Sequence, residues 1–314
     1  MKDHKQCPMK KTSIGGQAVL EGIMMRGPLN SAMSVRKPDG EIVTETWPTH
    51  KKPPQWYRKT PVIRGVFAFI DSMVGGYRCL MRSADLSGMS ELEEESKFDR
   101  WLKQKLGDKA TLAFGAVSLV LALALALGLF MFLPMLLVSL LDGVVPLGGW
   151  KTVLEGLLKV AVFILYIFLC TLVKDVRTTF EYHGAEHKCI FCYEAGDALT
   201  VENVRKQRRF HPRCGTSFLL IVLVLSILVS SIVTWDNMLI RVALKLLMLP
   251  VVCGLSYELI KFAGRHTNLL TRIISAPGLW LQRLTTNEPN DRQIEVAITA
   301  MERVIPEDKS LDNY

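Results

Sequence analysis

The sequence predicts a mainly α-helical integral membrane protein with about four transmembrane helices, amphipathic interfacial helices and a small N-terminal β element. Hydrophobic residues make up 49% of its 314 residues, charged residues only 22%, and the mean hydropathy is +0.24. No Asp, Glu, Lys or Arg occurs in the 32 residues from Ala110 to Leu141 or in the 21 from Gly215 to Trp235. These observations argue against a purely soluble protein or a disordered chain. The odd number of cysteines, seven, argues against a disulfide scaffold.

Four segments are apolar enough to be expected as membrane spans. A bilayer core about 30 Å thick requires about 20 apolar helical residues, because the backbone must satisfy its own hydrogen bonds there. The expected spans lie in residues 110–141, 153–173, 215–235 and 238–262. Pro134 is expected to kink or end the first span. The third is the most uniformly apolar, whereas Arg241 and Lys245 make the fourth the weakest.

These spans divide the chain into six expected segments. They are a cytoplasmic N-terminal β element (1–60), an amphipathic helix and linker (61–109), a first transmembrane helix pair (110–173), a cytoplasmic His/Cys loop (174–214), a second transmembrane pair (215–262) and a cytoplasmic interfacial C-terminal segment (263–314). In the β element, Lys37-Pro38-Asp39-Gly40 predicts a hairpin turn within Ala32–Thr46. Charges interspersed with apolar residues predict interfacial helices in Pro61–Ser83 and Leu269–Leu284.

Basic residues predict the orientation of the chain in the membrane. The 174–214 loop holds eight Lys and Arg residues, whereas the two short connections between spans hold few. Because positive charge is retained on the cytoplasmic side, this loop and both termini are expected to be cytoplasmic. The lipid bilayer and its anionic headgroups account for the net charge of +8, so nucleic acid is not expected as a partner.

The 174–214 loop also concentrates the residues that carry chemistry. Its first half contains His183, Glu186 and His187 in an H-x-x-E-H pattern. At about 100° per helical residue, the two histidines lie within about 40° of each other on one face. Such a pair binds zinc, and the carboxylate acts as a general base. The third ligand is expected from His211, Cys214, Glu258 or His266.

Two other interpretations remain open at this point. Cys189-x-x-Cys192 followed by His211-x-x-Cys214 has the spacing of a structural zinc ribbon, which requires the helix to end near Lys188. Alternatively, none of these residues binds a metal, and the cysteines are small core residues. In the histidine-centred interpretation, Cys192 points to the opposite face of the helix.

Several long motifs resemble those of the bacterial YqhQ-like membrane family. They are GGQAVLEGIMMRGP (15–28), HGAEHK (183–188), LTVENVR (199–205), HPRCGTSF (211–218) and PGLWLQ (277–282). The resemblance runs over nearly the whole chain and implies a protein of the bacterial inner membrane. The family is a domain of unknown function generally described as predicted metal-dependent enzymes.

The resemblance also bears on the site. His183, Glu186, His187, His211 and Cys214 fall on the family motifs, whereas Cys189 and Cys192 do not, which favours the histidine-centred site. The same pattern includes Gly15, Gly16, Glu21 and Arg26. The N-terminal segment is therefore expected to fold against the loop and to supply Glu21 or Arg26 to the site. Alternatively, it is a tight β-turn without a role in the site.

Two functions are therefore considered. The first is a metal-dependent hydrolase with His183, His187, His211 and Cys214 as ligands of zinc or another divalent transition metal, and Glu186 as its catalytic base. The alternative is a non-enzymatic membrane module that docks a protein partner, such as a translocation, insertion or lipid-handling machine. In that case the basic stretch Arg205–Arg209 is expected to contribute to the docking surface.

Overall fold

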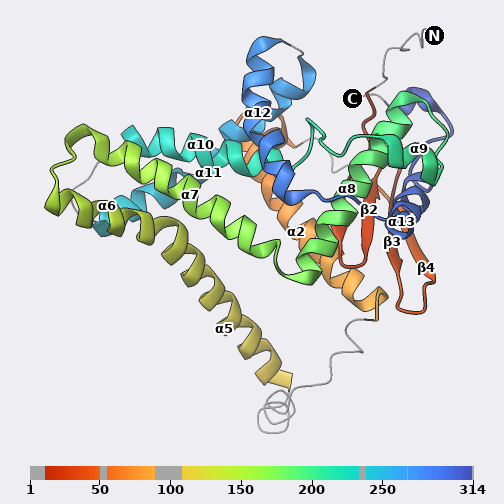
Figure 1. Ribbon diagram of the computed structural model, residues 1–314, viewed down its shortest axis with the longest axis horizontal. Coiled ribbons are helices and arrows are strands. Elements are labelled where there is room, and N and C mark those ends of the chain that lie inside the picture. The colour runs from red at the N-terminus through yellow and green to blue at the C-terminus, as the bar shows by residue number, and fades with distance from the viewer. Residues whose placement is uncertain (1–10, 50–54, 89–107, 233–237, 267, 313–314) are drawn as a thin grey trace. The chain divides into compact units, whose positions relative to one another are not determined.

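The computed structural model describes residues 11–49, 55–88, 108–232, 238–266 and 268–312 (Figure 1). The chain forms two compact units. The first consists of residues 1–90, 170–221 and 253–314, and the second of residues 91–169 and 222–252.

The elements of the first unit are the strands β1 (Gly15–Val19), β2 (Gly22–Arg26), β3 (Asn30–Arg36) and β4 (Ile42–Pro48), and the helices α1 (Trp56–Lys59), α2 (Ile63–Leu86), α8 (Lys174–Ala195), α9 (Val201–Lys206), α12 (Leu269–Thr285), α13 (Asp291–Glu302) and η3 (Lys309–Leu311). Those of the second unit are α5 (Asp108–Leu127), η1 (Gly128–Phe132), α6 (Leu133–Val144), η2 (Gly148–Trp150) and α7 (Lys151–Cys170). Helices α10 (Thr216–Ile232) and α11 (Met238–Arg265) contribute residues to both units.

The N-terminal β element is an antiparallel four-stranded meander in the order β1-β2-β3-β4. The predicted hairpin turn joins β3 to β4, with Arg36 opposite Ile42, and Gly40 adopts a φ of 95° that disfavours other residues. A sharper turn joins β1 to β2, where Val19 pairs with Gly22 and Glu21 has a φ of 49°. The sheet predicted from turn residues is therefore confirmed.

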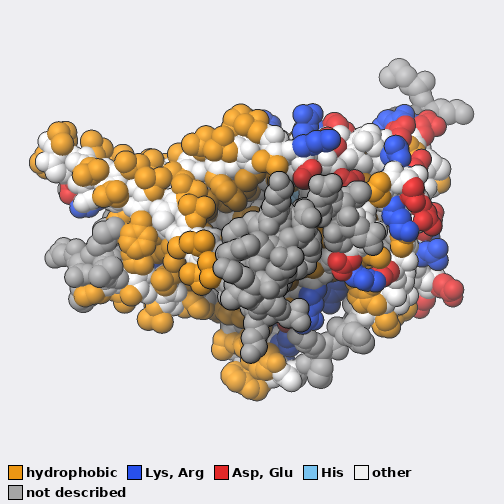
Figure 2. Space-filling view, turned by 90° about the horizontal axis from the view of Figure 1, so that it is seen from below, with side chains coloured by type: hydrophobic (Ala, Val, Ile, Leu, Met, Phe, Trp, Pro, Cys, Tyr) orange, Lys and Arg blue, Asp and Glu red, His pale blue; other side chains and the backbone are white. Residues whose placement is uncertain are grey.

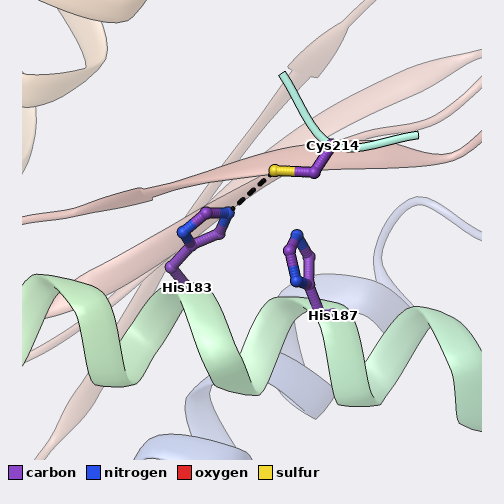
Figure 3. Close-up of side chains that lie close together, drawn as sticks. All are labelled: His183, His187 and Cys214. Carbon is purple, nitrogen blue, oxygen red and sulfur yellow. Dashed lines mark hydrogen bonds between the residues drawn. The ribbon is translucent and has the colours of Figure 1, made fainter. Parts of the chain in front are cut away.

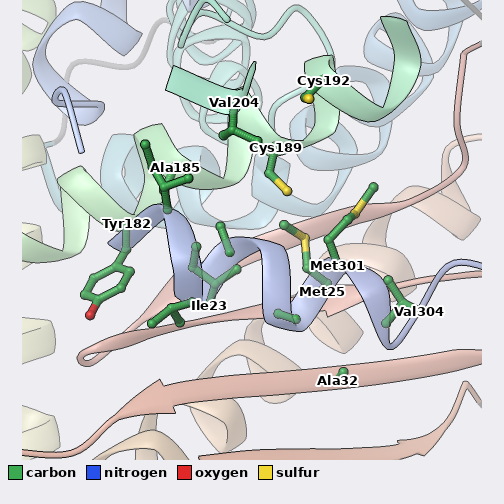
Figure 4. Close-up of a cluster of buried hydrophobic side chains, with 14 of the residues drawn as sticks. Ile23, Met25, Ala32, Tyr182, Ala185, Cys189, Cys192, Val204, Met301 and Val304 are labelled. Carbon is green, nitrogen blue, oxygen red and sulfur yellow. The ribbon is translucent and has the colours of Figure 1, made fainter. Parts of the chain in front are cut away.

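Helices cover both faces of this sheet. On one face, α8, α9 and α13 enclose a hydrophobic core with side chains of β2 and β3, including Ile23, Met25, Tyr182 and Met301 (Figure 4). On the other face, Val19, Met33 and Val35 pack with Cys79 and Leu86 of α2. The first unit is thus built of three layers.

Local signals explain where the two main core helices begin and end. Helix α13 starts at a capping box, in which Asn290 and Gln293 satisfy each other's backbone N–H groups. Helix α8 ends at Gly196, whose left-handed φ of 77° closes the last turn. Sequence reasoning did not anticipate α13, although its cap is present in the sequence.

Helices α5 and α6 of the second unit are joined through a single π-helical turn. The π turn η1 lies directly before Leu133 and Pro134, and the helix then continues to Val144. A wider turn accommodates a proline, which lacks an N–H group and crowds the carbonyl four residues earlier. The expected interruption at Pro134 therefore takes the form of a local widening.

Three helical segments among the described residues are long and apolar enough to cross a membrane: Val117–Val144, Gly148–Cys170 and Val242–Gly264. Figure 2 shows hydrophobic side chains dominating the surface of the second unit, whereas the charged side chains gather on the first. These helices indicate membrane association. The count of four spans is not confirmed, because the apolar stretch of α10 within the described residues, Phe218–Val229, is shorter than a span. The weakest expected span, 238–262, does meet the requirement.

The second unit contains a buried ionic cluster. Glu155 accepts from Lys159 Nζ at 2.8 Å, one helical turn away, and is also paired with Lys245. The side chains of all three residues are at most 10% exposed. Each ammonium group is therefore paired within the protein with the shared carboxylate.

We expect Glu155→Gln to destabilise the protein by about 3–5 kcal/mol, because two buried ammonium groups would lose their shared carboxylate. Asp142→Asn is the matched control, since its pair with Lys151 is about one-third exposed and is worth at most about 1 kcal/mol. Thermal unfolding in mild detergent measures both. Equal shifts for the two variants would contradict the expectation.

Candidate metal centre

Three side chains from two segments of the first unit, helix α8 and the residues just before α10, converge on one point. The ligand atoms of His183, His187 and Cys214 all lie within 4.8 Å of one another. His183 and His187 project from the same side of α8 toward the cysteine, which lies just before α10 (Figure 3). His183 Nε2 lies 3.1 Å from Cys214 Sγ. The predicted one-face arrangement of the two histidines is confirmed.

The backbone fixes which nitrogen of each imidazole faces the cluster. His183 Nδ1 lies 2.8 Å from the carbonyl oxygen of Thr285, and His187 Nδ1 is hydrogen-bonded to the carbonyl of Arg209. A carbonyl only accepts, so each Nδ1 carries the proton and each Nε2 presents a lone pair. Histidines that bind metals are held by this kind of outer hydrogen bond.

His187 Nε2 is the most informative atom of the cluster. The His187 side chain is 1% exposed, and its Nε2 is buried without a hydrogen-bond partner among the described residues. Burial, followed by the neighbouring His183, lowers the pKa of His187 and keeps its imidazole neutral. A buried lone pair without a donor is energetically unfavourable unless a ligand occupies the position.

Cys214 is held at the cluster by local hydrogen bonds. Thr216 places its hydroxyl 3.1 Å and its backbone N–H nitrogen 3.4 Å from the sulfur. Burial raises the pKa of Cys214, whereas the hydrogen bonds from Thr216 lower it, and the net pKa is lowered. The sulfur therefore has increased thiolate character, which is the form that binds metals.

Glu186 lies beside the cluster in a small cavity. It is one residue before His187 on α8, and a cavity of about 160 Å³ is lined by Glu186, His187, Cys214, Gly16 and eight other residues. Its Oε2 is buried without a partner, and burial raises its pKa to about 7. At neutral pH this carboxyl group can therefore both accept and return a proton.

Gly16 on β1 makes room for the Glu186 carboxyl group. A Cβ atom at Gly16 would lie 3.2 Å from Glu186 Cδ and would also collide with the carbonyl oxygen of Met24. Gly184 has the corresponding role on another side of α8, where a Cβ atom would overlap the carbonyl of Asn287. Both glycines allow backbone to approach the buried helix closely.

His211, a predicted ligand, lies next to the cluster but outside the group of three. Its ring centroid is 5.5 Å from that of His187, and its Nε2 is 4.0 Å from Glu194. Gln282 fixes its backbone by accepting from His211 N–H and donating to His211 carbonyl, both at 2.8 Å. Burial lowers the pKa of His211 more than Glu194 raises it.

The other residues considered as a third ligand lie elsewhere. Glu258 pairs with Arg64, and His266 is exposed and stacks on Phe262. The N-terminal segment does fold against α8, but Glu21 contacts Tyr182 at 3.4 Å and Arg26 lines a different cavity.

The zinc-ribbon interpretation does not fit the described structure. Helix α8 continues to Ala195 instead of ending near Lys188, and Cys189 and Cys192 are both buried in the hydrophobic core (Figure 4). Cys192 donates to the carbonyl of Ala198 at 3.6 Å. Burial raises the pKa of Cys192 to about 11, so this sulfur stays a neutral thiol.

Sequence reasoning missed the groups that orient the site. The Thr285 and Arg209 carbonyls have no signal in the sequence, since every residue has a carbonyl. Gln282 lies in the PGLWLQ motif, so that motif was the available signal for the element that holds His211.

The fold and site define a membrane-associated helical protein with a small sheet and a buried His/Cys cluster. The chain belongs to the family described as "Protein of unknown function (DUF1385)", which matches residues 60–307. It is 33% identical over 307 residues to "Uncharacterized protein YqhQ" of Bacillus subtilis (strain 168), covering 97% of this chain and 95% of that protein. No solved structure matches. The resemblance read from the motifs is thereby confirmed.

The raised pKa of Glu186 predicts a pH dependence of stability for the chelator-treated protein. An unfolded carboxyl titrates near 4.5 and the folded one near 7, so the folded state binds more protons between these values. Stability should therefore fall as pH rises through this window, by on the order of 3 kcal/mol. Glu186→Gln should be more stable than the wild type by that amount above pH 7 and equal to it near about pH 4. Parallel denaturant titrations test this; a constant difference across pH would refute it.

Proposed function

We propose that this protein is a membrane-embedded metal-dependent hydrolase in which His183, His187 and Cys214 hold the metal and Glu186 is the catalytic base. One observation carries the proposal: the buried, unpartnered Nε2 of His187 faces His183 Nε2 and Cys214 Sγ, while both Nδ1 atoms are tied to carbonyls. This donor set fits a transition metal, with zinc favoured by nitrogen and sulfur ligands.

A divalent metal held by three protein ligands would supply Lewis acidity at a fourth, open position. Glu186 accepts a proton from the attacking water at its unpartnered Oε2 and returns it to the leaving oxygen. Hydrolysis then consumes one water and splits one ester-type bond into an acid and an alcohol. The cavity beside Glu186 limits access of bulk water to this step.

The proposed placement is the bacterial inner membrane, with four spans and both termini in the cytoplasm. Helix α10 supplies the fourth span, which the apolar run from Gly215 supports. The basic residues between α7 and α10 then lie on the cytoplasmic side, where anionic headgroups are available to them. The metal centre would accordingly be at the cytoplasmic face.

The alternative, docking of a protein partner through the basic stretch Arg205–Arg209, has less support. Arg205 is paired with Asp291, Lys206 with Glu202 and Arg209 with Glu288. Arg208 lies over the ring of Phe191, 5.5 Å from its centroid. Gln207 donates to Asp197 at 3.1 Å, so all five side chains already have partners within the chain.

Metal content tests the ligand assignment. We expect about one metal ion per purified chain, lost in His187→Ala and Cys214→Ala because a site left with two ligands binds much more weakly. Cys192→Ala and His211→Ala should keep the metal, because these residues lie outside the group of three. Plasma mass spectrometry measures the metal, and circular dichroism verifies folding. Loss in Cys192→Ala but not in His187→Ala would overturn the assignment.

The role of Glu186 is tested by activity. Against a panel of ester substrates, Glu186→Gln should lower kcat by about 10²–10⁴-fold while the metal remains bound, because only the proton acceptor is removed. Glu302→Gln, at an exposed position on α13, serves as the control. Unchanged turnover in Glu186→Gln would refute the assigned role.

A further inference from the structure

A large cavity, here called the chamber, lies between the sheet and α2 on the face opposite α8. Its volume is about 880 Å³, within the range of ligand pockets. The sheet contributes Gln17, Met24 and Trp47 to its lining, and α2 contributes a stripe of residues. This stripe consists of Ala68, Asp71, Ser72, Gly75, Gly76 and Cys79.

Small side chains leave this space open. A Cβ atom at Gly75 would meet no atom within 4 Å, and one at Gly76 would lie 3.3 Å from the Gln17 amide. Arg26 and Ser72 of its lining are exposed, so the chamber is open to the surroundings and a ligand can enter it.

The charges of the chamber favour an anionic ligand. Its charged lining residues are Arg26, Arg58 and Asp71. Arg58 is paired with Asp71 at 2.7 Å, whereas Arg26 has no hydrogen-bond or ion-pair partner among the described residues. One guanidinium group is thus available for a phosphate or carboxylate.

Helix α2 also presents an apolar surface to its surroundings. The side chains of Ile70, Met73, Val74, Tyr77 and Met81 are 46–64% exposed. Apolar side chains on one surface of a helix, in a protein with candidate membrane spans, are typical of contact with lipid at the bilayer surface. A lipid could therefore keep its acyl chains along α2 while its headgroup enters the chamber.

The chamber and the cavity of the metal centre share a wall. Ser13, Gly15 and Gly16 line both cavities. A Cβ atom at Gly15 would project into open space, so no side chain thickens this wall there. A headgroup in the chamber would consequently lie on the other side of this short segment from Glu186.

We propose that the chamber binds the headgroup of an anionic phospholipid, with its phosphate at Arg26. This binding site goes beyond the proposed hydrolase and does not depend on it.

Native mass spectrometry of the full chain in mild detergent tests the binding. Phosphatidylglycerol should bind with a stoichiometry of about one at the high-affinity site, and Arg26→Gln and Gly75→Phe should each weaken it about tenfold. Gly75→Phe fills the chamber, whereas Gly149→Phe, at an exposed glycine outside the chamber whose Cβ atom would also meet no atom within 4 Å, should have no effect. Phosphatidylcholine, whose headgroup has no net charge, should bind about tenfold more weakly.

Two further measurements test whether the chamber is the lipid-binding site. Glycerol 1-phosphate should not displace the lipid; displacement would assign the site to a soluble phosphate and overturn the proposal. His187→Ala should retain lipid binding, because His187 lines the smaller cavity and not the chamber; loss of binding in this variant would overturn the proposal. Equal binding in the wild type, Arg26→Gln and Gly75→Phe, or equal binding of both lipids, would refute the inference.

Discussion

The burial of α8 on every side is the constraint on which the rest of the first unit depends. From Tyr182 to Cys192 each residue of this helix is buried, which is unusual for a segment with two histidines, a glutamate and a lysine. Polar groups taken out of water need partners, and most find them in neighbouring backbone. Lys188, for example, donates to the Arg205 carbonyl at 3.0 Å and pairs with Glu288 at 2.7 Å. The atoms left unpartnered, His187 Nε2 and Glu186 Oε2, stand out against this background.

Half of the candidate site could be predicted from the sequence, because the spacing of residues along a helix determines the direction in which their side chains point. His183 and His187 share a face of α8, while Cys189 and Cys192 lie on the core side, as the helical repeat requires. The third group could not be chosen from spacing. Cys214 and His211 both belong to a segment without regular structure before α10, and their positions depend on contacts that spacing does not encode: Gln282 holds the His211 backbone, and Thr216 bonds to the Cys214 sulfur.

The fold shows the same division between local and tertiary information. Turn residues predicted the hairpin at Gly40, because a positive φ is a property of the local chain. Apolar runs predicted helices, but hydropathy alone did not determine their lengths. The described apolar part of α10, Phe218–Val229, does not by itself make a span, whereas the 238–262 segment is long enough despite Lys245, which is paired with Glu155. The mean hydropathy of a sequence window does not detect an ion pair between helices that are distant in the sequence.

Glycines with opposite roles connect the metal centre to the chamber. Gly16 is needed for contact, since any side chain there would collide with β2 and crowd Glu186. Gly75 is needed for space, since a side chain there would meet nothing and would only reduce the cavity. The small sheet between α8 and α2 therefore packs closely on one side, where the Glu186 carboxyl group is buried, and borders an open chamber on the other.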